Sequence, residues 1–397
     1  MSRKLSYIST QTPKPYIYEN VIDIFKVKVE KYPDREIIID CGIDGSRESL
    51  NYRDLDTKAS KLAQYLLHKG LKPGERVALF GPNTIEWVIG ELAIIMAGGV
   101  VVHVAINAVD AGDIWEIFAA ADCKAFLIDP GKGEKYFDAI FYLLALFRRR
   151  RPSRDYQDID GQNPTVVFLR KMEEISSFVD LNTIVSQNFE ETFPVLYPED
   201  PILVFTTSGT TGKPKLVEHS HFEALNSTLG QSLDMSARKV YNDRPFGWIG
   251  GTPIIELLSG QVRVSIDTSL GTSGQHTGKI WDVIKSEKCT DAVLYPYFLT
   301  DLMSSCGTIS DDFKLKVIFT GGQIIGPEFS QIIGKFTEYL VISYGSTEAA
   351  IVCVNGPMME GGILTSGDVG NPLPGYEVKI VGENGKVLPR TKEGQVW

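Results

Sequence analysis

Residues 206–215 read "TTSGTTGKPK", which combines four threonines, a serine, two glycines and two lysines in ten positions. Hydroxyl groups and glycine N–H groups can wrap a polyphosphate, and a lysine adds a point charge. The spacing differs from the P-loop of NTPases, because Gly209 and Gly212 are too close and Pro214 disfavours a helix at Lys213. Strand-like residues flank the segment, so the pattern predicts a strand–loop–strand hairpin that holds a polyphosphate. Composition alone leaves open a flexible Ser/Thr/Gly turn without a ligand.

The composition of the whole chain limits the partners of such a loop. Its 397 residues are 43% hydrophobic and 23% charged, with a formal net charge of −10. That length predicts two or three packed subdomains, and that charge argues against a nucleic-acid surface. The phosphate site must therefore be local, built from a few lysines and backbone N–H groups. The five cysteines are scattered and form no CxxC pair, which favours a reduced intracellular compartment such as the cytoplasm and disfavours a zinc site.

Two apolar stretches could be mistaken for segments that span or bind a membrane. Residues 92–109 contain Gly98 and Gly99 followed by a β-branched run, which predicts a helix, a turn and a buried strand rather than a transmembrane span. The apolar part of residues 139–151 is too short to span. A helix with a solvated basic end is favoured there over a helix that lies on a membrane surface. The N-terminus lacks the apolar region of a secretory signal.

Helices and strands alternate over most of the chain. Strands are predicted at 76–80, 100–104, 124–129, 201–206, 316–320 and 339–344, and helices at 53–70, from Asn83 or Thr84 to about Met96, and at 112–122. The strands are continuous apolar runs, which is typical of a parallel sheet covered on both faces. The range 130–197 is less regular, and we expect connecting or variable structure there. The last residues, 377–397, predict a hairpin-like series of strands.

A second segment decides which anion the loop holds. Together, "TTSGTTGKPK" and "YGSTE" (344–348) resemble the signature of the adenylate-forming superfamily, which includes acyl-CoA synthetases, firefly luciferases and adenylation domains of peptide synthetases. Supporting matches are "FTGGQ" (319–323), "VGNPLPG" (369–375), "LNYRDLDTKASKLAQYL" (50–66) and "GLKPGERVALFGPN" (70–83). The resemblance covers nearly the whole chain in the family's order.

The resemblance implies the α/β fold of the family's large N-terminal domain, with two doubly wound sheets and a small distorted β-barrel. We expect a first α/β subdomain over about 1–200, with a variable insert near 130–197. A second α/β subdomain with the phosphate loop follows over about 201–365, and the start of the barrel over about 366–397.

The activity that the resemblance implies is ATP-dependent activation of a carboxylic acid, a fatty or other acyl acid. A carboxylate is a poor acyl donor, whereas attack on the α-phosphate of ATP gives an acyl-adenylate with AMP as leaving group. The thiol of coenzyme A can then take the acyl group. The first step needs a polyphosphate cradle, a Mg²⁺ ion to offset charge and alignment of two anions. ATP, Mg²⁺, coenzyme A and a small carboxylic acid are therefore the implied cofactors and partners of an acid–thiol ligase.

The resemblance also assigns roles by position. The cradle for the β- and γ-phosphates comprises Thr206, Thr207, Ser208, Gly209, Thr210, Thr211, Gly212, Lys213 and Lys215. Thr347 would contact the α-phosphate and Glu348 would hold Mg²⁺, so that Thr206, Lys215, Thr347 and Glu348 form the catalytic group. The adenine and acyl pocket would be lined by Tyr344, Gly345, Ser346, Gly321, Gly322 and Gln323. Each of these residues also has a purely structural alternative. Glu348 could be a solvated carboxylate, Tyr344 a core aromatic, and Gly321-Gly322 a plain turn.

The residues that would bind the carboxylic acid are less clearly indicated by the sequence. In "RPFGWIGG" (244–251), Gly247 and Trp248 stand where the family usually has an aromatic residue followed by His. Trp248, with Gly250, would wall or gate the acyl pocket, and a core tryptophan is the alternative. Tyr297 in "YPYF" is a second candidate wall, for which packing is the stronger alternative. His219 and His221 lack further metal ligands in the sequence, so hydrogen-bonding or structural roles are favoured.

The chain departs from the family's pattern in two ways. Leu216 replaces the glycine that usually follows the Pro-Lys pair, and a side chain there would crowd the loop. The later Gly-Asp segment, the hinge and the lysine-bearing C-terminal lid are not found, and Asp368 in "TSGDVG" is not given the ribose role. We therefore expect a fragment with weak activity. A carrier-protein-loading or luciferase-like protein, or a catalytically silent nucleotide-binding homologue, are the alternatives.

Overall fold

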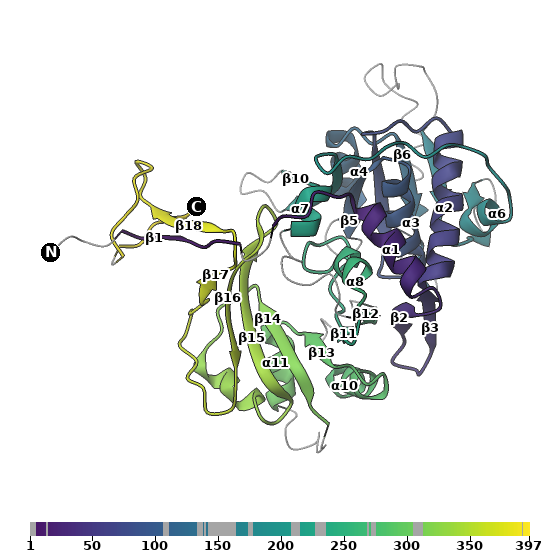
Figure 1. The fold of residues 1–397 in the computed structure, drawn as a ribbon. Helices are drawn as coiled ribbons and strands as arrows, with labels where there is room; N and C mark the ends of the chain where they lie inside the picture. Colours follow the sequence, from purple (N-terminus) through teal and green to yellow (C-terminus); the bar gives the residue numbers. More distant parts are fainter. Residues whose placement is uncertain are drawn as a thin grey trace. The chain divides into compact units, whose positions relative to one another are not determined.

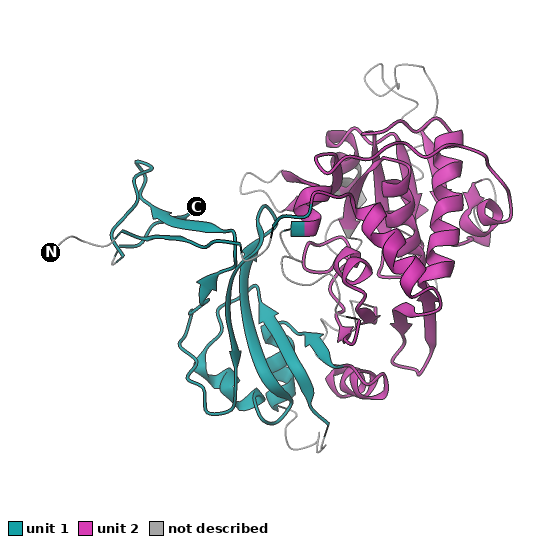
Figure 2. Cartoon of the chain, in the orientation of Figure 1, with its two compact units in different colours: residues 1–17, 226–231, 290–397 teal, residues 18–225, 232–289 magenta. Residues whose placement is uncertain are grey.

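Strands and helices alternate along the chain of the computed structural model (Figure 1). The structure describes residues 5–12, 15–105, 111–132, 138, 140–141, 164–173, 178–207, 215–226, 236–267, 270, 275–304, 313–390 and 392–397. Two compact units are present (Figure 2). Unit 1 comprises residues 1–17, 226–231 and 290–397, and unit 2 comprises residues 18–225 and 232–289. Within the described residues, no helix is both long and apolar enough to cross a lipid bilayer.

Unit 2 contains a seven-stranded sheet in the order β10-β9-β5-β4-β6-β7-β8. Its strands are β4 (Arg76–Gly81), β5 (Val100–Ala105), β6 (Ala125–Ile128), β7 (Thr165–Phe168), β8 (Val179–Asp180), β9 (Pro201–Thr207) and β10 (Lys215–Ser220). All neighbours are parallel except β9 and β10. The predicted parallel sheet is confirmed. The range 130–197, expected as connecting or variable structure, also supplies β7 and β8 to this sheet.

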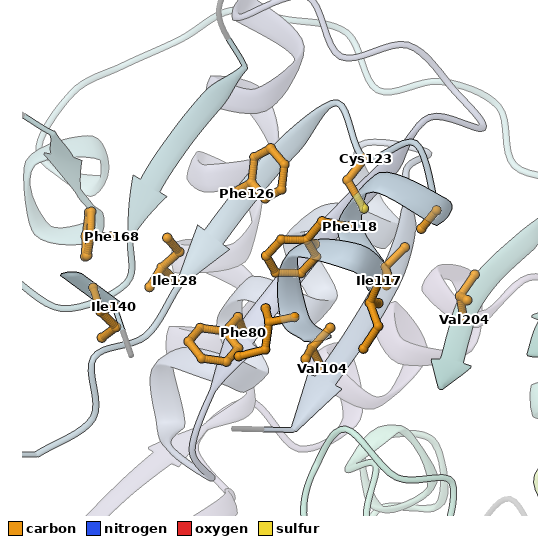
Figure 3. Close-up of a cluster of buried hydrophobic side chains, with 14 of the residues drawn as sticks. Phe80, Val104, Ile117, Phe118, Cys123, Phe126, Ile128, Ile140, Phe168 and Val204 are labelled. Atoms are coloured by element: carbon orange, nitrogen blue, oxygen red, sulfur yellow. The ribbon is translucent and has the colours of Figure 1, made fainter. Parts of the chain in front are cut away.

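Helices cover both faces of this sheet, as its continuous apolar strands require. On one face, α4 (Ala111–Ala120) packs its Ile117 and Phe118 against alternate strand residues such as Phe80 and Phe126 in a buried apolar cluster (Figure 3). On the other face lies α3 (Ile85–Met96), whose Gly90 lies against the side chains of Leu79, Leu127 and Leu169. Successive side chains of β4 therefore pack alternately against the helices on the two faces of the sheet.

Helix α3 also contacts β2 (Glu36–Cys41) and β3 (Arg47–Asn51), so it is enclosed on opposite sides. Every residue of α3 except Glu86 is buried, as expected for a helix that is apolar all round. Unit 2 also pairs β11 (Lys239–Tyr241), β12 (Val262–Ser265) and β2 in parallel, with β3 antiparallel to β2. Its other helices are α1 (Val21–Lys31), α2 (Tyr52–His68), α6 (Leu181–Val185), α7 (His221–Asn226, its last residue in unit 1), α8 (Ile254–Ser259) and α10 (Thr277–Ser286).

Unit 1 pairs β13 (Asp291–Val293), β14 (Leu315–Gly321) and β15 (Thr337–Ser346) in parallel. The antiparallel strands β16 (Ala350–Met358) and β17 (Asn371–Pro372) follow. Helix α11 (Pro296–Ser304) contacts the 3₁₀ helix η2 (Pro327–Ile332). A separate three-stranded sheet has the order β1-β18-β19, formed by β1 (Tyr7–Ser9), β18 (Glu377–Val381) and β19 (Gln395–Val396). The predicted C-terminal hairpin is confirmed, and the N-terminal strand β1 joins it.

Local predictions are confirmed at several element ends. Helix α2 ends before Gly70, which adopts a φ of 92°. The cap of α3 is Thr84, whose side chain accepts a hydrogen bond from the Trp87 N–H. Residues 92–105 form the end of α3, a turn and β5, rather than one apolar helix. Most of residues 139–151, where we expected a helix with a solvated basic C-terminal end, lie outside the described residues.

Candidate functional site

The predicted phosphate hairpin is present in unit 2 as the antiparallel pair β9 and β10. Thr207 faces Lys215, and Thr206 faces Leu216, so the two ends of the loop are held side by side. Both threonines are half-buried, whereas Lys215 is exposed. The strand–loop–strand prediction is confirmed for the two strands. The loop itself lies outside the described residues, and with it Ser208, Gly209, Thr210, Thr211, Gly212 and Lys213.

Leu216 does not stand free beside the loop. Its side chain packs against the buried cluster drawn in Figure 3, which contains Val204 and Ile117. The departure from glycine is therefore accommodated by the hydrophobic core of the sheet. We expected a side chain here to crowd the loop. In the structure Leu216 lies opposite Thr206 and packs against the apolar cluster, and the loop itself lies outside the described residues, so the crowding stays a prediction.

Buried rings fix the strand that leads into the loop. Phe205 stacks on the imidazole of His103 with ring centroids 4.7 Å apart, and His103 stacks on Trp87 at 6.1 Å. The Nε2 atom of His103 lies 2.8 Å from an Oε1 atom of Glu91, and both side chains are fully buried. The base of the phosphate hairpin is thereby tied to β5 and α3.

His219 and His221 occupy separate structural positions. His219 is buried and packs edge-on against Phe205, with centroids 5.8 Å apart. The Nδ1 atom of His221 accepts a hydrogen bond of 3.0 Å from the Val21 N–H at the start of α1. Burial lowers the pKa of His221 to about 4, so the ring is neutral at pH 7. The predicted hydrogen-bonding role is confirmed for His221. Among the described residues, no group of three or more His, Cys, Asp or Glu side chains is placed to hold a metal ion.

Residues 242–252, here called the Trp248 segment, join β11 to α8. The Trp248 side chain is 42% exposed, so the core tryptophan that we considered is excluded. Gly250 is exposed as well, whereas residues 242–247, 251 and 252 are buried. A Cβ atom at Gly251 would lie 2.0 Å from the Pro245 carbonyl oxygen, so the segment doubles back tightly on itself. Trp248 and Gly250 thus stand at the tip of a folded loop.

Buried polar groups hold this segment in place. Asn83 donates to the Arg244 carbonyl at 2.8 Å and accepts from the Phe246 N–H at 2.8 Å. The Thr252 hydroxyl donates to Glu91 at 3.1 Å. The guanidinium of Arg263 donates to the carbonyls at both ends of the segment. Sequence reasoning treated Asn83 only as a possible helix cap and missed Glu91 and Arg263.

The signal that was available for these residues was a charge inside an apolar run. Glu91 stands in "IEWVIGELAIIM" and Arg263 in "VRVS", both elements that are otherwise buried. Arg263 pairs with Glu256 at 3.1 Å. Burial raises the pKa of Glu256 and lowers that of Arg263, while their mutual attraction opposes both shifts.

The residues of unit 1 that the sequence assigns to the nucleotide lie at the carboxyl ends of two neighbouring parallel strands. Gly321 ends β14 and pairs with Ser343 of β15, so "FTGGQ" and "YGSTE" are adjacent. A Cβ atom at Gly321 would lie 2.3 Å from the Ser343 carbonyl oxygen, and Gly322 has a φ of 79°. Carboxyl ends of parallel strands are the usual place for ligands in α/β sheets. The structure therefore brings together Gly321, Gly322, Gln323, Tyr344, Gly345 and Ser346.

The rest of "YGSTE" forms the turn between β15 and β16. Glu348 is exposed in this turn, and the Tyr376 hydroxyl donates to the Ala349 carbonyl at 2.9 Å. The Tyr344 side chain is 39% exposed, which excludes the alternative of a core aromatic. A Cβ atom at Gly345 would lie 2.0 Å from the Ala350 carbonyl oxygen, so only glycine fits the paired strands. Thr347, half-buried, begins the turn.

Two other sequence candidates are placed in unit 1. Tyr297 is half-buried in α11, with its ring 6.4 Å from that of Tyr295, and its role in an acyl pocket stays a prediction. The carboxylate of Asp368 accepts from the Gly370 N–H at 2.9 Å within its own turn. Leaving Asp368 out of the nucleotide site stays a prediction.

Comparison with known proteins decides the family. The sequence profile described as AMP-binding enzyme matches residues 25–397. This chain belongs to that family. It is 26% identical to the mitochondrial medium-chain acyl-CoA ligase ACSF2 of Mus musculus, over 99% of this chain and 66% of the relative. The chain thus spans about two thirds of the length of that curated relative.

Solved structures agree with the fold. A luciferase-like enzyme from the mealworm Zophobas morio superposes with a TM-score of 0.80 at 18% identity, over 98% of this chain and 88% of that one. The anthranilate CoA ligase AuaEII, in complex with anthranoyl-AMP, superposes with a TM-score of 0.76 at 18% identity, over 96% and 70%. The predicted α/β fold of the N-terminal domain of adenylate-forming enzymes is confirmed.

Proposed function

We propose that this AMP-binding protein activates a carboxylic acid with ATP and transfers the acyl group to coenzyme A. The observation that carries the proposal is the "YGSTE" turn beside "FTGGQ" at the carboxyl ends of β15 and β14. In the first step a carboxylate oxygen attacks the α-phosphorus, the bond to the β-phosphate oxygen breaks, and pyrophosphate leaves. In the second step a thiolate attacks the acyl carbon and AMP leaves, while the thiol proton goes to solvent.

We assign the nucleotide roles as follows. Thr206, Thr207 and Lys215, with residues 208–213, bind the β- and γ-phosphates through hydroxyl, N–H and ammonium groups. Thr347 binds the α-phosphate. The exposed ring of Tyr344 stacks on adenine, and the glycines at 321, 322 and 345 let backbone approach the nucleotide closely.

The described residues also fit a magnesium ion. Mg²⁺ is commonly bound through one or two carboxylates together with substrate phosphates. Glu348 offers an exposed carboxylate in the turn that follows the adenine residues. When bound, the ion would offset the charge of the phosphates and so favour attack by the anionic acid. Glu348 would hold it.

In unit 2 the acid would meet Trp248 and Gly250, the exposed tip of the Trp248 segment. In unit 1, Tyr297 is the further candidate that the sequence suggests. An indole offers a large apolar face, which suits an acyl chain or an aryl ring. Medium-chain fatty acids are the first substrates to test, because the curated relative is a medium-chain acyl-CoA ligase.

The test is acid-dependent exchange of labelled pyrophosphate into ATP by this chain. The acids are octanoate, decanoate, palmitate and benzoate. We expect exchange with at least one of them, and a loss of at least tenfold in the variant Glu348→Gln. The matched control is Glu377→Gln, which alters an exposed carboxylate in β18 of the same unit and should retain activity. If ATP binds but no acid supports exchange, the silent nucleotide-binding alternative replaces this proposal.

A further inference from the structure

Arg263 is an unusual residue for its place in the fold. It lies in β12, between the parallel strands β11 and β2, and its side chain is fully buried. Strands in such positions are normally apolar, and a buried guanidinium carries a large desolvation penalty. An aliphatic side chain would complete this strand without that penalty. The stability of the sheet therefore does not explain the arginine, and its contacts must.

Those contacts converge on the Trp248 segment. The Nε atom of Arg263 donates to the Asn242 carbonyl at 2.7 Å, and an Nη2 atom donates to the Gly251 carbonyl at 3.0 Å. An Nη1 atom donates to Glu256 at 3.1 Å, and the guanidinium lies 5.1 Å from the centroid of Phe246. One planar group thus joins the first residue of the segment to its penultimate residue. Lysine, with a single ammonium, lacks this fixed fork.

Other contacts fix the middle and the end of the same segment. Asn83 holds the backbone at Arg244 and Phe246, and Glu91 holds Thr252. With its two ends and its middle fixed, the segment leaves only residues 248–250 outside the buried interior. These three residues include the Trp248 and Gly250 of the proposed acid site.

We propose that Arg263 is a positioning residue for acid binding, because it fixes the Trp248 segment in the shape that presents Trp248 and Gly250 to the acyl group. The acid as ligand rests on the proposed function. The hydrogen bonds by which Arg263 holds the Trp248 segment do not depend on any substrate. Arg263 acts through the backbone of the segment and does not touch the acid.

The first test measures whether Arg263 holds the segment. The variant is the double replacement Arg263→Met with Glu256→Leu, which removes both charges and so leaves no unpaired buried ion. Hydrogen exchange is followed at the N–H groups of Trp248, Gly251 and Thr252, which are hydrogen-bonded within the segment. We expect their exchange to speed up at least tenfold. The control Phe118→Leu, in the apolar cluster of the other sheet, loosens packing without touching the segment and should leave these rates unchanged.

The second test measures acid binding separately from nucleotide binding. The probes are octanoyl-sulfamoyl adenosine and AMP. The ratio of their dissociation constants reports how much the acyl group contributes to binding affinity. We expect the double variant to reduce that contribution at least tenfold with AMP affinity unchanged, and Arg263→Lys to fall between it and the wild type. Unchanged exchange rates or an unchanged ratio in the folded double variant would overturn the role of Arg263. Absence of AMP binding by the wild type would instead overturn the proposed function, and the acid-binding role with it.

Discussion

His221 should make the stability of unit 2 depend on pH in a defined window. Its ring is fully buried, and its Nδ1 atom accepts the Val21 N–H at 3.0 Å. Protonation would place a charge in the interior and remove that acceptor. Burial therefore lowers the pKa of His221 from 6.5 to about 4. Because the unfolded chain binds the proton more readily, unfolding is favoured as the pH falls from 6.5 towards 4.

The size of the effect follows from the two pKa values. A lowering of the pKa from 6.5 to about 4 corresponds at most to about 3 kcal/mol of unfolding free energy. That contribution is fully present above pH 6.5 and is lost as the pH falls through 4. Between pH 7 and pH 5.5 the expected loss is about 1 kcal/mol, and by pH 4.5 it reaches about 2 kcal/mol.

The assay compares the wild type with His221→Asn by denaturant unfolding between pH 4.5 and 7.5. Asparagine places an oxygen acceptor near the Nδ1 position but does not titrate, so the difference between the proteins should shrink as the pH falls. The control Ala224→Gly, in the same helix, should lower stability by the same amount at every pH. A titration of the ring by NMR measures the pKa directly. A value near 6.5, or a difference between the proteins that does not vary with pH, would refute the reasoning.

Four further changes test the site and its supports. Gly345→Ala should unfold the β15–β16 turn and abolish AMP binding, because its Cβ would lie 2.0 Å from the Ala350 carbonyl oxygen. Gly278→Ala, where nothing lies within 4 Å, should be neutral or stabilising in thermal melts. Thr84→Ala should cost more than about 1 kcal/mol, because it removes both the cap of α3 and the hydrogen bond from the Thr84 hydroxyl to the buried Asp129. Thr84→Ser should restore most of that stability in the same denaturant assay. Trp248→Ala should weaken the binding of octanoyl-sulfamoyl adenosine at least tenfold and leave the binding of AMP unchanged, both measured by calorimetry.

The sequence predicted the elements whose signals are local. The strand–loop–strand character of residues 201–220 followed from apolar runs on either side of a Gly- and Thr-rich loop, and β9 and β10 confirm it. The end of α2 followed from Gly70, and the turn after α3 from Gly98 and Gly99. Each of these depends on periodicity or on backbone preferences within a few residues, which a single sequence displays directly.

Other strands were not predicted from the sequence, and one of them depends on pairing between distant segments. Strand β1 joins β18 although Ser9 and its partner Glu377 lie 368 positions apart in the chain. Strand β7 completes the seven-stranded sheet from a range that looked irregular. Strand β1 is only three residues long, so the partner strand gives it a defined structure. The residues "TVVF" of β7 all favour strands, and this local signal was overlooked because the surrounding range is irregular.

The same division holds for the site. The sequence by itself determined the family and the residues that resemble its nucleotide motifs, since those are short runs of specific types. Only the tertiary structure decided that Trp248 is exposed, that Leu216 packs into the core, and that Asn83, Glu91 and Arg263 hold residues 242–252. Asn83 and Glu91 lie about 160 positions from the backbone and hydroxyl groups that they bind. A charge in an apolar run signals that a partner exists, but the fold alone selects which one, because the penalty of burial is offset only where donors and acceptors meet.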